Sequence, residues 1–219
     1  MFYHIFDYLE QFDFPGAGMF QYITFRSACA VILSLLIATV VGKRIIRILQ
    51  KQQVGEEIRD LGLEGQMQKK GTPTMGGVII LLAILVPVIL FARLDNVYIQ
   101  LMIVSTIWLG LIGFLDDYLK VVLRRSDGLL AWQKFGLQVV VTGIFVYYIL
   151  NYTNVDLAMR IPFWPNHYLN LGWLAIPVLF FAVIGTVNGV NFTDGLDGLA
   201  SSVTLIVAVF FSVVSIGMK

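Results

Sequence analysis

The sequence contains little of what disulfide-bonded or metal-thiolate proteins need. It has one cysteine, Cys29, which lies in an apolar run. A lone thiol excludes a disulfide framework and any site built from several cysteines. Charged residues are also scarce, at 13% of 219 residues, against about 25% in soluble globular domains. The chain therefore has too little polar sequence to cover the surface of a soluble protein.

Long apolar stretches stand where charges are missing. A helix that crosses the hydrocarbon layer needs about 20 apolar residues. Six stretches have such a length: residues 23–42, 76–92, 97–115, 135–152, 171–187 and 198–218. Only the first holds a charge, Arg26, which we expect to snorkel to the interface. Because open strands would leave backbone groups unpaired in lipid, we predict an all-α fold, a single polytopic membrane domain over residues 1–219 with six transmembrane helices.

Basic residues are concentrated in alternate connections between these stretches. Two connections hold most of the 15 Lys and Arg residues: Lys43, Arg44, Arg47, Lys51, Arg59, Lys69 and Lys70 in the first, and Lys120, Arg124, Arg125 and Lys134 in the second. The connection 151–170 holds only Arg160. By the positive-inside rule, both basic connections are cytoplasmic and the N-terminus is outside. Residues 188–197 are then cytoplasmic too, and His4 and His167 lie in outer segments, where we assign them no metal role.

Two adjacent carboxylates, Asp116 and Asp117, follow the third apolar stretch. Anions at the C-terminal end of a helix are unfavourable by about 0.3–1 kcal/mol each, and the two also repel each other. A bound cation would relieve both costs, and Mg²⁺ typically takes one or two carboxylates together with substrate phosphates. The alternative is a solvated acidic pair that marks the membrane boundary, with Lys120 as its neighbour. Spacing alone leaves both interpretations open.

The connection before the last apolar stretch is rich in Asn, Asp and Gly. Asp194 and Asp197 are three residues apart, as are Asn188 and Asn191, so each pair can share one helix face. Interspersed glycines allow a ligand to approach the backbone closely. The alternative, a helix cap by Thr193 or Asp194, explains only one of these residues. We therefore predict a ligand site in this segment.

Lysines complete the polar set on the predicted cytoplasmic side. Lys69 and Lys70 precede a helix start, where ammonium and free N–H groups suit a phosphate. Two lysines beside a span, like Lys134 beside another, are equally ordinary markers of topology. Taken together, carboxylates and lysines without His or Cys ligands indicate Mg²⁺ and phosphates, and such parts fit phosphoryl transfer.

Three segments together resemble a known family. They are KKGTPTMGG at residues 69–77, GFLDDY at 113–118 and NGVNFTDGLDGLA at 188–200. They are similar to the phospho-N-acetylmuramoyl-pentapeptide-transferases, of the polyprenyl-phosphate N-acetylhexosamine-1-phosphate transferase superfamily. The aspartate pair is shared across that superfamily, whereas the KGTPTMGG motif belongs to the muramoyl branch. The resemblance runs along essentially the whole chain.

This resemblance implies a Mg²⁺-dependent reaction at the cytoplasmic face of the bacterial inner membrane. UDP-MurNAc-pentapeptide and undecaprenyl phosphate would react to give lipid I and UMP. The expected partners are these two substrates and the lipid bilayer, with a homodimer as one option and no nucleic acid. The implied catalytic residues are Asp116 and Asp117, which are also the implied metal ligands, with Lys70 and Lys134. The implied substrate-binding residues are Thr74, Lys120, Asn188, Asn191, Asp194, Gly195, Leu196 and Asp197, the last three resembling a uracil pocket.

The family has ten spans, so we expect this chain to be its N-terminal part. We then expect the family's further metal-binding aspartate and its histidine-rich loop to lie beyond the chain. A sibling transferase that uses UDP-GlcNAc is disfavoured by the KGTPTMGG motif. A membrane transporter is disfavoured because its polar residues would lie near the bilayer midplane, whereas here they gather at one surface.

Overall fold

The computed structural model describes residues 1–51, 75–121, 123, 128–161, 163–164, 166–194 and 198–217. The chain forms two compact units, Met1–Val141 and Thr142–Lys219, and each is described by itself. Nearly all regular structure is helical, as the apolar stretches predict.

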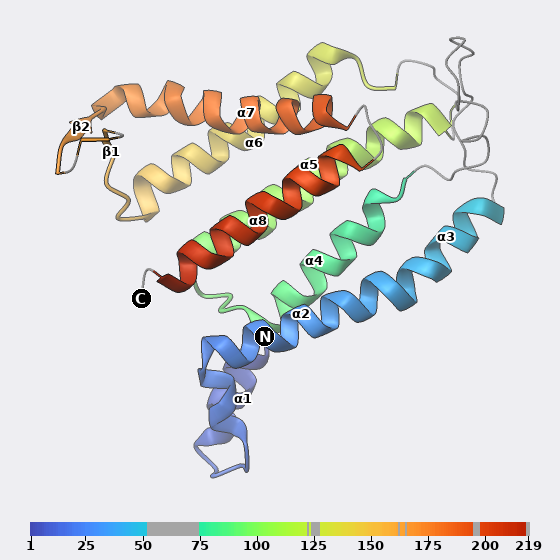
Figure 1. The fold of residues 1–219 in the computed structure, drawn as a ribbon, viewed down its shortest axis with the longest axis vertical. Helices are drawn as coiled ribbons and strands as arrows, with labels where there is room; N and C mark the ends of the chain where they lie inside the picture. The colour runs from blue at the N-terminus through green and yellow to red at the C-terminus, as the bar shows by residue number, and fades with distance from the viewer. Residues whose placement is uncertain are drawn as a thin grey trace. The chain divides into compact units, whose positions relative to one another are not determined.

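One long helix dominates the start of the first unit. α2 (Ile23–Leu36) continues through a π-helical turn, η2 (Ile37–Val41), into α3 (Gly42–Lys51), and Figure 1 shows them as one unbroken helix. The first span therefore extends beyond its predicted end at residue 42. The extension follows from the sequence, because α3 places isoleucines on one face and basic residues on the other, the pattern of a helix that leaves the membrane surface.

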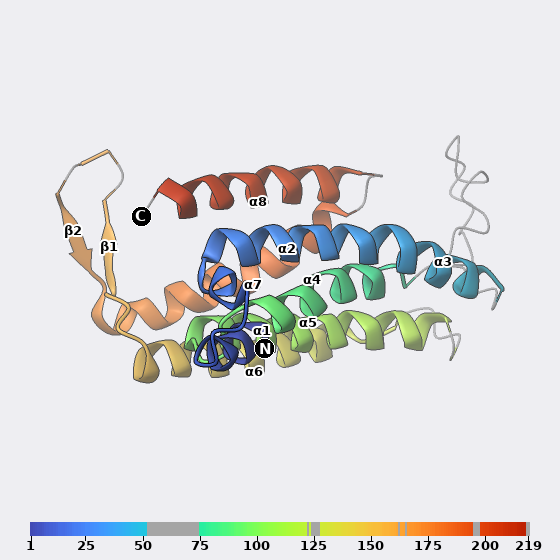
Figure 2. The same cartoon turned by 90° about the horizontal axis from the view of Figure 1, so that it is seen from below.

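Three further helices complete the first unit. They are α4 (Gly77–Phe91), α5 (Val97–Val121) and the first half of α6 (Ala131–Tyr152). α4 packs against both α2 and α5, and the three run alongside one another in Figures 1 and 2. A glycine permits the α4–α5 approach, because a Cβ on Gly110 would lie 2.7 Å from both Leu81 methyl carbons.

A short N-terminal helix, α1 (Phe2–Glu10), packs at the end of this unit where α2 begins. It is followed by a 3-10 turn, η1 (Ala17–Gln21). The Phe6 ring stacks on Phe20 with a centroid separation of 3.8 Å. The Met1 ammonium donates a hydrogen bond to a carbonyl at the end of α4 (2.9 Å). These contacts fix the N-terminal aromatic segment against the transmembrane helices.

Arg26 does not snorkel as expected. It is only 7% exposed, because its guanidinium donates hydrogen bonds to the carbonyls of Phe20 and Gln21 and lies 4.8 Å from the centre of the Tyr3 ring. The expectation was wrong because the N-terminal segment folds back over the start of α2. The carbonyls of that segment replace the water that a snorkelling side chain would reach.

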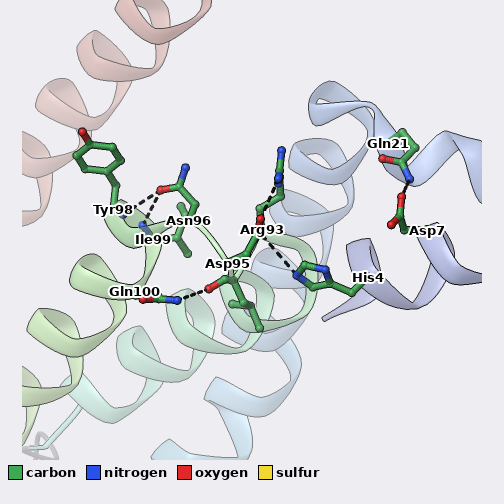
Figure 3. Close-up of polar contacts among 10 residues, drawn as sticks. His4, Asp7, Gln21, Arg93, Asp95, Asn96, Tyr98, Ile99 and Gln100 are labelled. Atoms are coloured by element: carbon green, nitrogen blue, oxygen red, sulfur yellow. Dashed lines mark hydrogen bonds and ion pairs between the residues drawn. The ribbon is translucent and has the colours of Figure 1, made fainter. Parts of the chain in front are cut away.

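The turn between α4 and α5 carries a small polar cluster beside α1 (Figure 3). Asp95 accepts from Arg93 (2.8 Å) and lies 3.5 Å from His4. The hydrogen bond from Arg93 lowers the pKa of Asp95 below its usual value. Asn96 caps α5, since its side-chain oxygen accepts from the backbone N–H of Tyr98 (2.9 Å).

The second unit contains the end of α6, a hairpin and two helices. Strands β1 (Ala158–Arg160) and β2 (Tyr168–Asn170) pair antiparallel, with Met159 opposite Leu169. This hairpin was not predicted, because three-residue strands are too short to show a two-residue period.

The hairpin leads through a 3-10 turn, η4 (Gly172–Leu174), into α7 (Ala175–Thr193). The last helix, α8 (Leu199–Gly217), contacts α7.

Five helices of the described chain are long and apolar enough to cross a membrane: Ile23–Lys51, Val97–Val121, Ala131–Tyr152, Gly172–Thr193 and Leu199–Gly217. The remaining predicted span corresponds to α4, an apolar helix of 15 residues. At 1.5 Å per residue it covers about 22 Å, less than the hydrocarbon thickness of about 30 Å. The protein is therefore a polytopic helical membrane protein, with one span shorter than predicted.

Candidate functional site

The paired carboxylates lie inside α5. This helix continues to Val121, beyond the predicted boundary of the span at residue 115. Asp116 and Asp117 therefore belong to its last turns, at the C-terminal end of a helix as predicted. Asp116 is only 8% exposed, whereas Asp117 is half-buried. The interpretation as a solvated acidic pair is therefore wrong for Asp116.

Three donors converge on the Asp116 carboxylate. Its Oδ1 accepts from the backbone N–H of Leu129 (2.8 Å). Its Oδ2 accepts from the Lys134 ammonium (2.7 Å) and pairs with the Lys120 ammonium (3.0 Å). Lys120 reaches this oxygen because it follows by one helical turn on the same face. Lys134 reaches it from the first turn of α6.

The resulting cluster of Asp116, Lys120 and Lys134 has more positive than negative charge among its own three groups. The lysine side chains are 35% and 31% exposed, so each ammonium can also reach a ligand. The first turn of α6 adds the partial positive charge of a helix N-terminus. Such a cluster is suited to a phosphate or diphosphate.

A divalent cation would find few protein ligands here. Within the described residues, no group of three or more His, Cys, Asp or Glu side chains could hold a metal ion. Both oxygens of Asp116 already face N–H donors. The two adjacent carboxylates could supply one or two ligands to Mg²⁺. The remaining oxygen ligands of the ion would have to come from substrate phosphates.

The Asn and Asp residues of the second predicted site lie at the end of α7, in the second unit. Asn188 donates to the carbonyl of Ile184 (2.8 Å), one turn back in the same helix. Asn191 and Asp194 are exposed. Asp194 is the residue that ends α7, and α8 begins only at Leu199, so a cap of α8 by Thr193 or Asp194 is wrong.

Of the predicted site residues, the structure brings Asp116, Lys120 and Lys134 together. Five others fall outside the described residues: Lys70, Thr74, Gly195, Leu196 and Asp197. Sequence reasoning missed the Leu129 backbone amide, because an N–H group that every residue except proline carries leaves no sequence signal.

A model of glycosyl transferase family 4 matches residues 98–218, more than half of the chain. The chain belongs to this family. A second model, the phospho-N-acetylmuramoyl-pentapeptide-transferase signature 1, matches residues 69–81.

Relatives of that name share much of the sequence. The phospho-N-acetylmuramoyl-pentapeptide-transferase of Flavobacterium psychrophilum is 44% identical over 262 residues, covering 100% of this chain and 63% of the relative. That of Parabacteroides distasonis is 42% identical, covering 98% of this chain and 61% of the relative. The resemblance predicted from the three motifs is thus confirmed. The chain spans about three-fifths of the length of these relatives.

Proposed function

We propose that the full-length protein transfers phospho-MurNAc-pentapeptide from UDP-MurNAc-pentapeptide to undecaprenyl phosphate, giving lipid I and UMP. The reaction takes place at the cytoplasmic face of a bacterial inner membrane, the side on which the basic residues gather. The observation that carries the proposal is the cluster of Asp116, Lys120 and Lys134. The names of the relatives and the signature at residues 69–81 support the muramoyl donor.

The two lysines hold the diphosphate of the donor. Both ammonium groups contact the same Asp116 oxygen, Lys120 at 3.0 Å and Lys134 at 2.7 Å. The two nitrogens therefore lie no farther apart than these two distances together. That separation suits neighbouring phosphate oxygens. In phosphoryl transfer, positioning and charge neutralisation supply most of the catalysis. Lys120 and Lys134 provide both when the donor phosphates take over their contacts.

Asp116 orients these lysines and is not the attacking group. Its oxygens are held by a backbone N–H and two ammonium groups, contacts that lower the nucleophilicity of a carboxylate. The lipid phosphate is mostly dianionic at pH 7, since its second pKa is near 6, and needs no general base. One of its oxygens bonds to the phosphorus attached to MurNAc, and the bond from this phosphorus to the bridging oxygen breaks. UMP leaves with that oxygen.

Mg²⁺ is the proposed cofactor. Asp117 is the proposed carboxylate ligand, because it is half-buried, whereas Asp116 is only 8% exposed. When bound, the ion would neutralise charge on the diphosphate together with the lysines. By resemblance, Gly195, Leu196 and Asp197 form a uracil pocket, and Lys70 is a further catalytic residue. Thr74, Asn188, Asn191 and Asp194 are further substrate-binding residues by the same resemblance.

The experiment is a UMP-release assay on membranes that contain the full-length protein. UMP should form from UDP-MurNAc-pentapeptide only when undecaprenyl phosphate is present, and should stop with EDTA and resume with Mg²⁺. UDP-GlcNAc in its place tests the sibling transferase. UMP release from UDP-GlcNAc but not from UDP-MurNAc-pentapeptide would overturn the proposed donor. Release that survives thorough removal of Mg²⁺ would overturn the cofactor.

A further inference from the structure

We propose that Gly128 is a positioning residue for Asp116. Its backbone conformation directs the Leu129 N–H toward the carboxylate. Because glycine has no Cβ, it also leaves room for the Asp116 carboxylate. The inference rests on the proposed function, because that function makes the Asp116 cluster the phosphate site. Gly128 itself carries no functional group and has no part in the chemistry.

The backbone at Gly128 is in the left-handed region, with φ of +57°. L-residues rarely adopt this conformation, whereas glycine adopts it without steric cost. The peptide plane that follows Gly128 carries the N–H of Leu129, so the conformation of Gly128 sets the direction of that donor. The donor meets Asp116 Oδ1 at 2.8 Å. A change in this backbone conformation would turn it away.

The space beside Gly128 is filled by the cluster. A Cβ at this position would lie 2.5 Å from Asp116 Oδ1, and 2.8 Å and 3.0 Å from the Cε and Cγ of Lys120. The flexible Lys120 stem can move aside. Oδ1 cannot move without weakening its bond to the Leu129 N–H, and rotation of the carboxylate also carries Oδ2 away from both ammonium groups. Any side chain at 128 therefore disturbs all three contacts of Asp116.

Other glycines show that this crowding does not follow from a positive φ alone. Among the described glycines in this conformation, Gly16, Gly172 and Gly198 have no atom within 4 Å of an added Cβ. Gly172 has φ of +50°, close to that of Gly128. The variant Gly172→Ala thus imposes the same backbone strain without the collision, and it is the matched control.

The test compares Gly128→Ala, Gly128→Asn and Gly172→Ala in the full-length protein. Asn tolerates the left-handed conformation better than Ala but still adds a Cβ, so it separates collision from strain. Both Gly128 variants should lower kcat at least tenfold, with KM for UDP-MurNAc-pentapeptide within threefold of the wild-type value. The thermal stability of the purified protein should match that of Gly172→Ala, which should keep wild-type kcat.

The outcomes separate this inference from the proposed function. A wild-type protein without transferase activity would overturn the proposed function. An active wild type whose Gly128 variants keep kcat within threefold would overturn only the role of Gly128. So would an equal fall in Gly172→Ala or a failure of both Gly128 variants to fold, since either would make the effect structural. A loss expressed wholly in KM would also overturn it, because that result means weaker donor binding without loss of transition-state positioning.

Discussion

At the scale of single residues, Asp116 is a buried carboxylate whose charge is matched by two lysines from different helices. The variant Asp116→Asn removes the charge that holds both ammonium groups at one point. Because each lysine is about one-third exposed, it can turn to water and the protein should stay folded. Turnover should fall on the order of 100-fold, the typical cost of losing a preorganised charge in a site. The measurement is kcat of purified protein with matched thermal stability, and near-normal turnover would contradict the role of Asp116.

Asp117 should behave differently from its neighbour. If it holds Mg²⁺, the variant Asp117→Asn should raise the Mg²⁺ concentration for half-maximal turnover, on the order of tenfold or more. Asp116→Asn should leave that concentration nearly unchanged while it lowers the maximum. Titration of turnover with Mg²⁺ in both variants checks this. If only Asp116→Asn raised the Mg²⁺ concentration for half-maximal turnover, Asp116 and not Asp117 would be the metal ligand.

The sequence predicts those contacts of the site that follow from local helical spacing. Lys120 follows Asp116 by four residues, so helical spacing alone places the two together. Lys134 belongs to the next helix and is linked to the site only by resemblance or by structure. The amide of Leu129 and the conformation of Gly128 depend on how the intervening connection folds. Neither follows from a local pattern.

At the scale of elements, the contact between α4 and α5 depends on Gly110. A methyl group there would lie 2.7 Å from both Leu81 methyl carbons. Those methyls are the flexible end of a side chain, so the expected destabilisation of Gly110→Ala is about 1–3 kcal/mol, the usual cost of overpacking. Thermal unfolding of the purified protein should show it, and Leu81→Ala in the same chain should restore much of the loss.

Gly113 provides the control for this prediction. It lies on the same helix, and a Cβ there would meet no atom within 4 Å. Gly113→Ala should be neutral or stabilising, because Ala is favoured over Gly in helices by about 1 kcal/mol. Equal destabilisation by both variants would show that helix flexibility is responsible, and that the Leu81 contact is not.

The helices also show which features the sequence patterns could predict and which they could not. Apolar length predicted the positions of the long helices, because the requirement to span lipid is strong. It misplaced their ends, since α5 continues through Asp116 and Asp117 to Val121 and α3 continues the first span to Lys51. Polar residues can extend a helix out of lipid at no cost in hydrogen bonding. Arg26 was misjudged because its partners are carbonyls of a segment that precedes its helix.

At the scale of the whole molecule, the distribution of charge predicts how the chain sits in the membrane. Basic residues along α3 and at the Asp116 cluster lie on one side of the predicted topology, and the N-terminal aromatic segment lies on the other. The donor that we propose, UDP-MurNAc-pentapeptide, is a cytoplasmic nucleotide and could reach the cluster only in that orientation. The proposed function therefore requires this orientation.

The orientation can be tested by labelling single cysteines in intact cells. The native thiol is removed as Cys29→Ser, and one cysteine is placed at Gln50, in α3, or at Asn154, after α6. Both positions are exposed, so a difference in labelling reports the side of the membrane and not burial. An impermeant thiol reagent should label only position 154, and position 50 should react only after the cells are permeabilised. Labelling of position 50 in intact cells would invert the topology and place the Asp116 cluster on the side that a cytoplasmic nucleotide cannot reach.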